Sequence, residues 1–309
     1  MNAVERYLAP TTLAQALAAL ATPGGATVLA GGTDLMPQAN AGRVKAASTL
    51  LNIRRVQGLS AVALDGNALV IGTLATLATL QHDALVRAQA PLLVDAIDHF
   101  ASDQIRNAAT LGGNLCNASP AGDTLTPLLA LDAQVELARL TDDGTIATRR
   151  LPLADFFIAP GRTRREPHEL LTAVRVPLRG TGQIARFHKA GTRPALDIST
   201  ISIALAAQRD DQGCLHDVRL ALGAVAPTPV RAHRAEALLE GRRLDAALAA
   251  QAAQAAADEA TPIDDVRATA WYRRELVNNL TRRMLDDVTR MKSASGSTVS
   301  SSAPASTSA

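Results

Sequence analysis

The sequence is poor in cysteine, in aromatic residues and in net charge. Among its 309 residues are only two cysteines, Cys116 and Cys214, without C-x-x-C spacing. The chain by itself therefore cannot hold an iron–sulfur cluster or a cysteine-ligated zinc. The six histidines are scattered, so we expect no metal site. Aromatic residues make up 2% of the chain and the net charge is +2, which gives no basis for nucleic-acid binding.

Targeting segments and the common nucleotide-binding motifs are also missing. No apolar run approaches the length of a membrane span, and the first residues lack a basic-then-apolar signal pattern. We therefore expect a soluble, cytoplasmic protein. Neither a G-x-G-x-x-G fingerprint opening a helix nor a G-x-x-x-x-G-K-[ST] loop is present. A bound dinucleotide would need a different architecture.

Two glycine pairs are present, and each ends a short apolar run. Gly31 and Gly32 follow Val28-Leu29-Ala30, and Gly112 and Gly113 follow Ala109-Thr110-Leu111. Glycine removes the Cβ that would block a ligand, and successive backbone N–H groups can form an anion-binding nest. We interpret both segments as strand-to-loop transitions. Together they predict a diphosphate held from two sides, and therefore a dinucleotide cofactor.

A polar stretch follows the second pair. Asp123 could accept hydrogen bonds from ribose hydroxyls, and Asn114 or Thr110 could donate to phosphate. The same residues are equally typical of a surface loop built from Asx and Ser turns. On the residues alone, ligand binding and a plain turn both remain open.

Periodicity and turn residues divide the chain into four parts. A capping box at Thr12 to Gln15 predicts a helix through Leu20. Asp34 either caps a second, short helix, which is the commoner role, or faces a ligand. Asp65-Gly66-Asn67 predicts a hairpin. The last stretch is rich in Ser, Ala and Thr without periodicity, which predicts disorder. The expected parts are 1–57, 58–177, 183–290 and a disordered tail at 291–309.

Longer motifs carry a family resemblance. The motif segments are 30–35, 105–124, 169–172, 187–190, 195–198 and 272–274. The segment 105–124 is long and unusual enough to be specific, whereas either glycine pair alone would not be. With these segments the chain resembles, from about residue 3 to residue 286, the flavin (medium) subunit of the molybdenum hydroxylases, the xanthine dehydrogenase and carbon monoxide dehydrogenase family.

The resemblance implies an α+β fold that binds FAD. The expected fold is that of vanillyl-alcohol oxidase and p-cresol methylhydroxylase, with two α/β subdomains at 1–57 and 58–177. A C-terminal domain of three antiparallel strands and a helical bundle would follow at 183–290.

The resemblance also implies a set of FAD-binding residues. The loop from Leu29 to Leu35 would wrap the diphosphate through backbone N–H groups. Thr110, Gly113 and Asn114 would line its other side. Asp123 would contact the sugar or adenine half. The full implied set is Leu29, Ala30, Gly31, Gly32, Thr33, Asp34, Leu35, Phe100, Thr110, Gly112, Gly113, Asn114, Asn117, Asp123, Leu171 and Lys189.

Three implied positions carry an alternative interpretation. Phe100 would stack on the isoalloxazine ring or belong to the core. Leu171 would touch the ring through its backbone or be an ordinary buried strand residue. Lys189 would place a cation near the ring or the diphosphate, or be a solvated lysine at a strand end. Arg106 and Asn107 are expected to order their loop rather than touch FAD.

The implied function is electron transfer, with no catalytic acid or base in this chain. A large molybdopterin subunit and a small subunit with two [2Fe–2S] clusters would complete a heterotrimer, which could dimerise. The electron acceptor would be NAD, a quinone or oxygen. One alternative is a self-contained flavin oxidoreductase, which would need a base or proton donor over the ring, and no convincing candidate is present. The other is a non-catalytic scaffold that has lost FAD; the intact glycine pairs, Asn114 and Asp123 argue against it.

Overall fold

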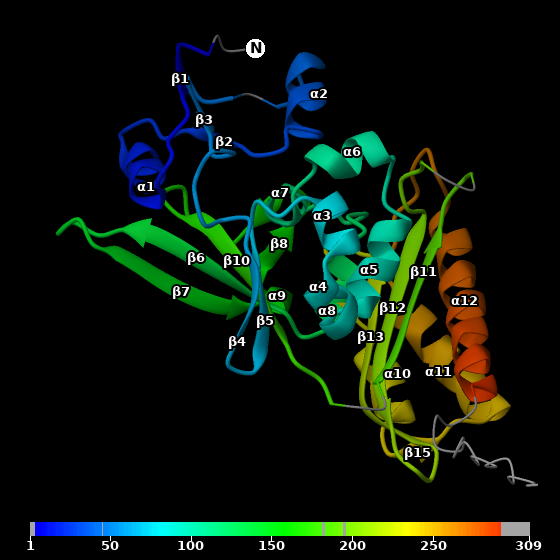
Figure 1. Ribbon diagram of the computed structural model, residues 1–309. Helices are drawn as coiled ribbons and strands as arrows, with labels where there is room; N and C mark the ends of the chain where they lie inside the picture. The colour runs from blue at the N-terminus through cyan, green and yellow to red at the C-terminus, as the bar shows by residue number, and fades with distance from the viewer. Residues whose placement is uncertain (1–3, 45, 181–182, 194–195, 292–309) are drawn as a thin grey trace, which may run out of the picture.

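The computed structural model of the protein describes residues 4–44, 46–180, 183–193 and 196–291 (Figure 1). The N-terminal region is a small parallel sheet with the strand order β1-β3-β2 and two helices. As predicted, Thr12 and Gln15 form a capping box at the start of the first helix, which buries Ala16, Leu17 and Leu20. Its elements are β1 (Arg6–Leu8), α1 (Leu13–Ala21), β2 (Thr27–Leu29), α2 (Leu35–Asn40) and β3 (Thr49–Asn52).

A five-stranded antiparallel sheet forms the middle of the molecule, in the order β4-β5-β10-β6-β7. The predicted hairpin at Asp65-Gly66-Asn67 joins its first two strands. The strands are β4 (Val62–Asp65), β5 (Ala68–Gly72), β6 (Gln134–Leu140), β7 (Ile146–Pro152) and β10 (Leu170–Pro177).

A series of short helices follows β5 and precedes β6 in the chain, and these helices cover the sheet. Their apolar faces form the largest core cluster, which extends into the C-terminal region through Phe187, Ala204 and Ala221. The elements between the sheet strands are α3 (Leu77–His82), α4 (Ala84–Gln89), α5 (Pro91–Asp98), α6 (Asp103–Ala108), α7 (Leu111–Asn117), α8 (Leu125–Ala130), α9 (Leu153–Phe156), β8 (Phe157–Ala159) and β9 (Arg162–Thr163).

The C-terminal region is an antiparallel sheet between two layers of helices. Figure 1 shows α10, α11 and α12 on one face of the sheet and α5 and α8 on the other. Two short strands, β14 and β15, extend the three long strands that were predicted. The elements are β11 (Gln183–Ala190), β12 (Ile201–Arg209), β13 (Cys214–Gly223), β14 (Val230–Arg231), α10 (His233–Leu239), β15 (Arg242–Arg243), α11 (Ala246–Glu259) and α12 (Ala270–Arg290).

One predicted feature is wrong, and another lies outside the described residues. The second glycine pair does not follow a strand as a loop: Gly112 and Gly113 lie in the first turn of α7. The Thr110 hydroxyl accepts from the Gly113 N–H and caps this helix, which offsets part of the cost of two glycines in its first turn. The tail expected to be disordered lies outside the described residues from residue 292 onward.

Within the described ranges, no helix is long and apolar enough to cross a membrane. The same ranges contain no group of three or more His, Cys, Asp and Glu side chains that could hold a metal ion.

Candidate cofactor site

The loop between β2 and α2 presents free backbone donors. Gly32 has φ +74°, a left-handed conformation that glycine adopts without strain. None of the backbone N–H groups from Gly31 to Leu35 donates a hydrogen bond to another described residue. Such a run of free N–H groups around a left-handed residue is suited to binding an anion. We call residues 31–35 the N–H cradle.

The N–H cradle lies directly against the junction of α6 and α7. A Cβ on Gly31 would overlap the carbonyl oxygen of Ala108 and lie close to the Cα of Ala109. Only glycine therefore permits this close approach. The structure thus brings the two glycine segments together, although they are far apart in the sequence.

The second glycine segment has few free backbone donors. Gly112 is buried, and its N–H donates to the Thr73 carbonyl oxygen at 3.0 Å. A Cβ on Gly112 would overlap the Thr73 hydroxyl. Gly113 is exposed, but its N–H donates to the Thr110 hydroxyl oxygen at 3.0 Å. The expectation of a second open loop is therefore wrong. What this segment offers a ligand is the Thr110 hydroxyl proton and the exposed backbone surface at Gly113.

The two asparagines of α7 differ in their bonding. The side-chain oxygen of Asn114 accepts from the Thr124 hydroxyl at 2.7 Å, which leaves its NH₂ group as a donor. Asn117 is half-buried and forms no side-chain hydrogen bond with any residue in the described ranges. Both amides thus retain donor capacity on the helix that adjoins the N–H cradle.

Asp34 does not cap α2 as expected. It occupies the N-cap position, but its side chain forms no capping hydrogen bond. Its exposed carboxylate instead accepts from the Gln38 amide at 2.5 Å. Asp34 thus lies within the N–H cradle, and its side chain accepts from none of the cradle's backbone N–H groups.

Asp123 and Lys189 form a buried ion pair, a contact that sequence reasoning missed. The Lys189 Nζ lies 2.6 Å from Asp123 Oδ2 and 3.0 Å from the His99 carbonyl oxygen. The Ser199 hydroxyl donates to Asp123 Oδ1 at 2.5 Å. Both side chains of the ion pair are 8% exposed, so Lys189 is not a solvated lysine at a strand end. Burial raises the pKa of Asp123, and Lys189 and Ser199 partly offset the rise.

Phe100 and Leu171 are placed differently with respect to the core. Phe100 follows α5 and packs, half-buried, against the edge of the main core. Arg106 donates to the carbonyl oxygens of Phe100 at 2.6 Å and Ala101 at 3.2 Å, so it orders this loop as expected. Leu171 is 1% exposed as a whole residue and lies inside the main core on β10, as an ordinary buried strand residue would.

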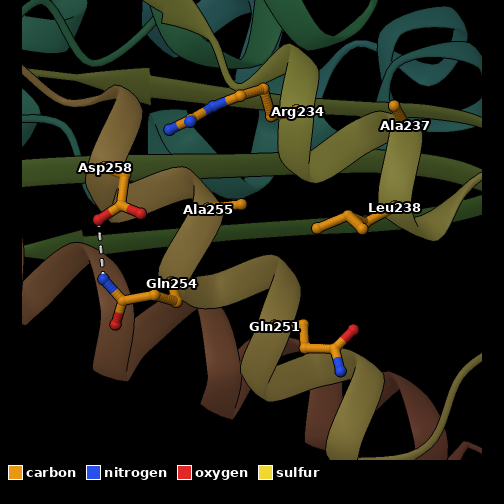
Figure 2. A pocket seen from close by; sticks show the side chains of 7 residues that line it. All are labelled: Arg234, Ala237, Leu238, Gln251, Gln254, Ala255 and Asp258. Carbon is orange, nitrogen blue, oxygen red and sulfur yellow. Dashed lines mark hydrogen bonds between the residues drawn. The ribbon is translucent and has the colours of Figure 1, made fainter.

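A surface groove lies between α10 and α11, in a different part of the fold. Figure 2 shows that it is lined by side chains of both helices, with a 2.8 Å hydrogen bond from Gln254 to Asp258. None of the predicted site residues lines it. Its lining residues are Arg234, Ala237, Leu238, Gln251, Gln254, Ala255 and Asp258.

Comparisons with known proteins identify the family. Residues 2–179 match the FAD binding domain in molybdopterin dehydrogenase, and residues 186–288 match the CO dehydrogenase flavoprotein C-terminal domain. The chain is 32% identical to the xanthine dehydrogenase FAD-binding subunit of Escherichia coli O157:H7, over 91% of this chain and 94% of the relative. It is 30% identical to the carbon monoxide dehydrogenase medium chain of Hydrogenophaga pseudoflava, over 91% and 95% of the two chains.

A solved structure agrees with this assignment. The reconstituted CO dehydrogenase from Oligotropha carboxidovorans contains a chain that superposes with a TM-score of 0.86 at 28% identity, covering 92% of this chain and 97% of that one. The N–H cradle fits the group that the family binds, because free backbone donors are what a diphosphate requires. The predicted resemblance is confirmed: the chain belongs to the family of FAD-binding subunits of the xanthine and carbon monoxide dehydrogenase type, which are oxidoreductase subunits.

Proposed function

We propose that this chain is the electron-transfer subunit of a heterotrimeric molybdenum hydroxylase. Bound FAD would supply the redox chemistry, taking electrons from [2Fe–2S] clusters on a small partner and delivering them to a terminal acceptor such as NAD, a quinone or oxygen. A large partner would carry the molybdopterin, and two heterotrimers could form a dimer. The two unclustered cysteines support this division, because the iron–sulfur clusters must then lie on another chain. The medium-chain names of the relatives support the proposed partners.

The N–H cradle is the observation that carries the proposal. Its donors from Gly31 to Leu35 would hold the diphosphate, with Leu29 and Ala30 leading into the turn. Charge-assisted hydrogen bonds from backbone N–H groups are stronger than neutral ones and need no side chain. The cradle would therefore bind FAD with fixed backbone geometry, without any lysine or arginine on the loop.

The remaining contacts come from the other elements of the site. The Thr110 hydroxyl, the Gly113 backbone and the amides of Asn114 and Asn117 would line the opposite side of the cofactor. We assign Gly112 to packing against Thr73 rather than to the cofactor. The other proposed contacts are the Phe100 ring, the Leu171 backbone and the Asp123–Lys189 pair.

We propose that the chain consists of two FAD-binding subdomains and one C-terminal flavoprotein domain. We propose boundaries at 1–57 and 58–177 for the subdomains and 183–290 for the C-terminal domain. The change from a parallel sheet to a separate antiparallel sheet supports the first boundary. The passage from β10 to β11, which belong to different sheets, supports the second.

The first test is an absorption spectrum of the purified full chain, with mass spectrometry of the material released by acid. We expect a flavin spectrum and roughly equimolar FAD, or stoichiometric uptake of added FAD by a colourless preparation. A chain that neither holds nor takes up FAD would favour the scaffold alternative.

A second test addresses the partners. We expect the tagged chain, purified from its source cells, to bring down two further chains together with iron and molybdenum. A yellow protein that purifies alone and oxidises its own substrate would instead favour the self-contained flavin oxidoreductase.

A further inference from the structure

A buried carboxylate joins the middle region to the C-terminal region. Asp123 lies between α7 and α8, and both of its oxygens are bound by residues of the C-terminal region. Ser199, which is fully buried just before β12, donates to Oδ1 at 2.5 Å. Lys189 on β11 donates to Oδ2 at 2.6 Å. The carboxylate is therefore fixed from two sides by the neighbouring region.

The position of Asp123 is tied to the helix that adjoins the N–H cradle. The next residue, Thr124, donates its hydroxyl to the Asn114 side chain of α7 at 2.7 Å. On the other side, Gly122 packs so closely that an added Cβ would lie 3.3 Å from the same Asn114 oxygen. A shift of Asp123 would therefore move Asn114, which is proposed to face the cofactor.

We infer that Ser199 is a positioning residue of the FAD site, through which the C-terminal region fixes Asp123 and hence the Asn114 face of α7. This inference rests on the proposed FAD-binding function. Ser199 acts through Asp123 and is not itself assigned a cofactor contact. A hydrogen bond from a hydroxyl to a buried carboxylate is charge-assisted, so its loss has a larger effect than loss of a neutral bond.

The groups around Asp123 influence its pKa, so the pH dependence of the site can be measured as a second effect. The groups that face it are Lys189 from β11, the His99 residue after α5, and Ser199. Burial favours the protonated acid, whereas the bonds from Lys189 and Ser199 favour the carboxylate. Removing the Ser199 hydroxyl therefore raises the pKa of Asp123 further. Acid should then disrupt the site at a higher pH in the variant than in the parent.

Ser202 provides a matched control three residues along the same segment. Its hydroxyl lies 2.8 Å from that of Thr126, and Ser202 is also buried. This bond joins the same two regions without involving Asp123; Ser202 lies opposite Lys189 in the β11–β12 register, but its hydroxyl is bonded to Thr126. Ser199→Ala and Ser202→Ala thus each remove one buried hydroxyl and one bond between the regions, and only Ser199→Ala leaves Asp123 with one bond fewer.

The experiment measures FAD dissociation constants of the full-length parent, Ser199→Ala and Ser202→Ala by fluorescence titration, and the pH at which half of the flavin is released. For Ser199→Ala we expect roughly tenfold weaker FAD binding, because a hydrogen bond to a charged group contributes that much. We also expect its release midpoint to move to higher pH. Ser202→Ala should match the parent in both measurements.

The outcomes separate this inference from the proposed function. A parent chain without FAD affinity would overturn both. A parent that binds FAD, with a Ser199→Ala variant of unchanged affinity and release pH, would overturn only the role of Ser199. Equal weakening in both variants would also overturn it, because general docking of the two regions would then explain the loss. If Ser199→Ala does not fold, Ser199→Cys keeps the volume with only a weak donor, and the same directions are expected.

Discussion

The two glycine pairs look alike in the sequence and differ in the structure. The pair at Gly31 and Gly32 turns the chain, and its backbone N–H groups have no acceptor among the residues that the structure describes. The pair at Gly112 and Gly113 opens a helix whose first N–H groups already have acceptors. The same dipeptide after an apolar run thus marks a candidate ligand site in one case and close packing of the chain in the other.

Gly31, Gly32 and Gly112 are required for different reasons, and the difference runs between positions rather than between the pairs. An added Cβ would overlap the Ala108 carbonyl at Gly31 and the Thr73 side chain at Gly112. Gly32 is required instead by its backbone angle, and it meets only the ends of the Leu29 and Met36 side chains. Glycine therefore permits a close loop contact at Gly31, a close contact at the start of a helix at Gly112 and a left-handed turn at Gly32.

The largest expected effect is that of Gly112→Val on stability. The added side chain would overlap Thr73 in a buried contact, and overpacking of this kind costs about 1–3 kcal/mol. Chemical denaturation should show this loss in the FAD-free protein. Gly180→Val is the control and should lose clearly less, because an added Cβ there would meet nothing within 4 Å. Equal stability of the Gly112 variant and the parent would contradict the packing role.

Gly32→Val should separate cofactor binding from stability. A β-branched residue at φ +74° costs about 1–2 kcal/mol in backbone strain, so the protein should still fold. Its side chain would occupy the turn of the N–H cradle, and we expect flavin retention to be lost. Gly144→Val is the matched control, because Gly144 has φ +80° in an open hairpin turn outside the site.

Flavin content and denaturant midpoints of the two variants decide this comparison. We expect similar loss of stability in both and loss of flavin in the Gly32 variant alone. Normal flavin content in Gly32→Val would contradict binding at the N–H cradle.

Local signals predicted the elements whose stabilising contacts are also local. The capping box of Thr12 and Gln15 gave the start of α1, and the Asp65-Gly66-Asn67 turn gave the β4–β5 hairpin. The start of α7 lacks such a signal. Its cap joins Thr110 to Gly113, a residue that cannot complete a capping box and that favours turns when seen alone.

Long-range pairing limited the prediction of the site. The resemblance identified Asp123 and Lys189 separately, but their ion pair joins residues 66 positions apart. Ser199 lies 76 positions from Asp123, directly after the motif segment 195–198, which does not include it. Such contacts follow from how the C-terminal sheet packs on α5 and α8, which local periodicity does not encode.

Thr110→Val tests what the second segment contributes besides packing. It removes the hydroxyl that caps α7, which should lower stability by about 1 kcal/mol, and it removes the donor proposed for the cofactor. Thr269→Val removes the equivalent cap of α12, far from the site in sequence and fold. We expect similar stability losses in thermal unfolding, with weaker FAD binding in the Thr110 variant only. Equal FAD affinity in both variants would restrict Thr110 to its capping role.

Asp34→Asn should have the smallest effect, and it tests whether the N–H cradle binds through its backbone alone. The Asp34 carboxylate is exposed and accepts only from Gln38 among the described residues. Near a diphosphate its charge is unfavourable, but solvent and salt screen exposed charges, so we expect a change in FAD affinity of less than about threefold. Any change should be toward tighter binding, and it should shrink as salt is raised in the titration. Gln38→Ala is the control, because it frees the carboxylate without removing its charge. A tenfold loss of affinity in Asp34→Asn would mean that the carboxylate accepts hydrogen bonds from the cofactor's hydroxyls. The N–H cradle would then bind FAD through a side chain as well as through its backbone.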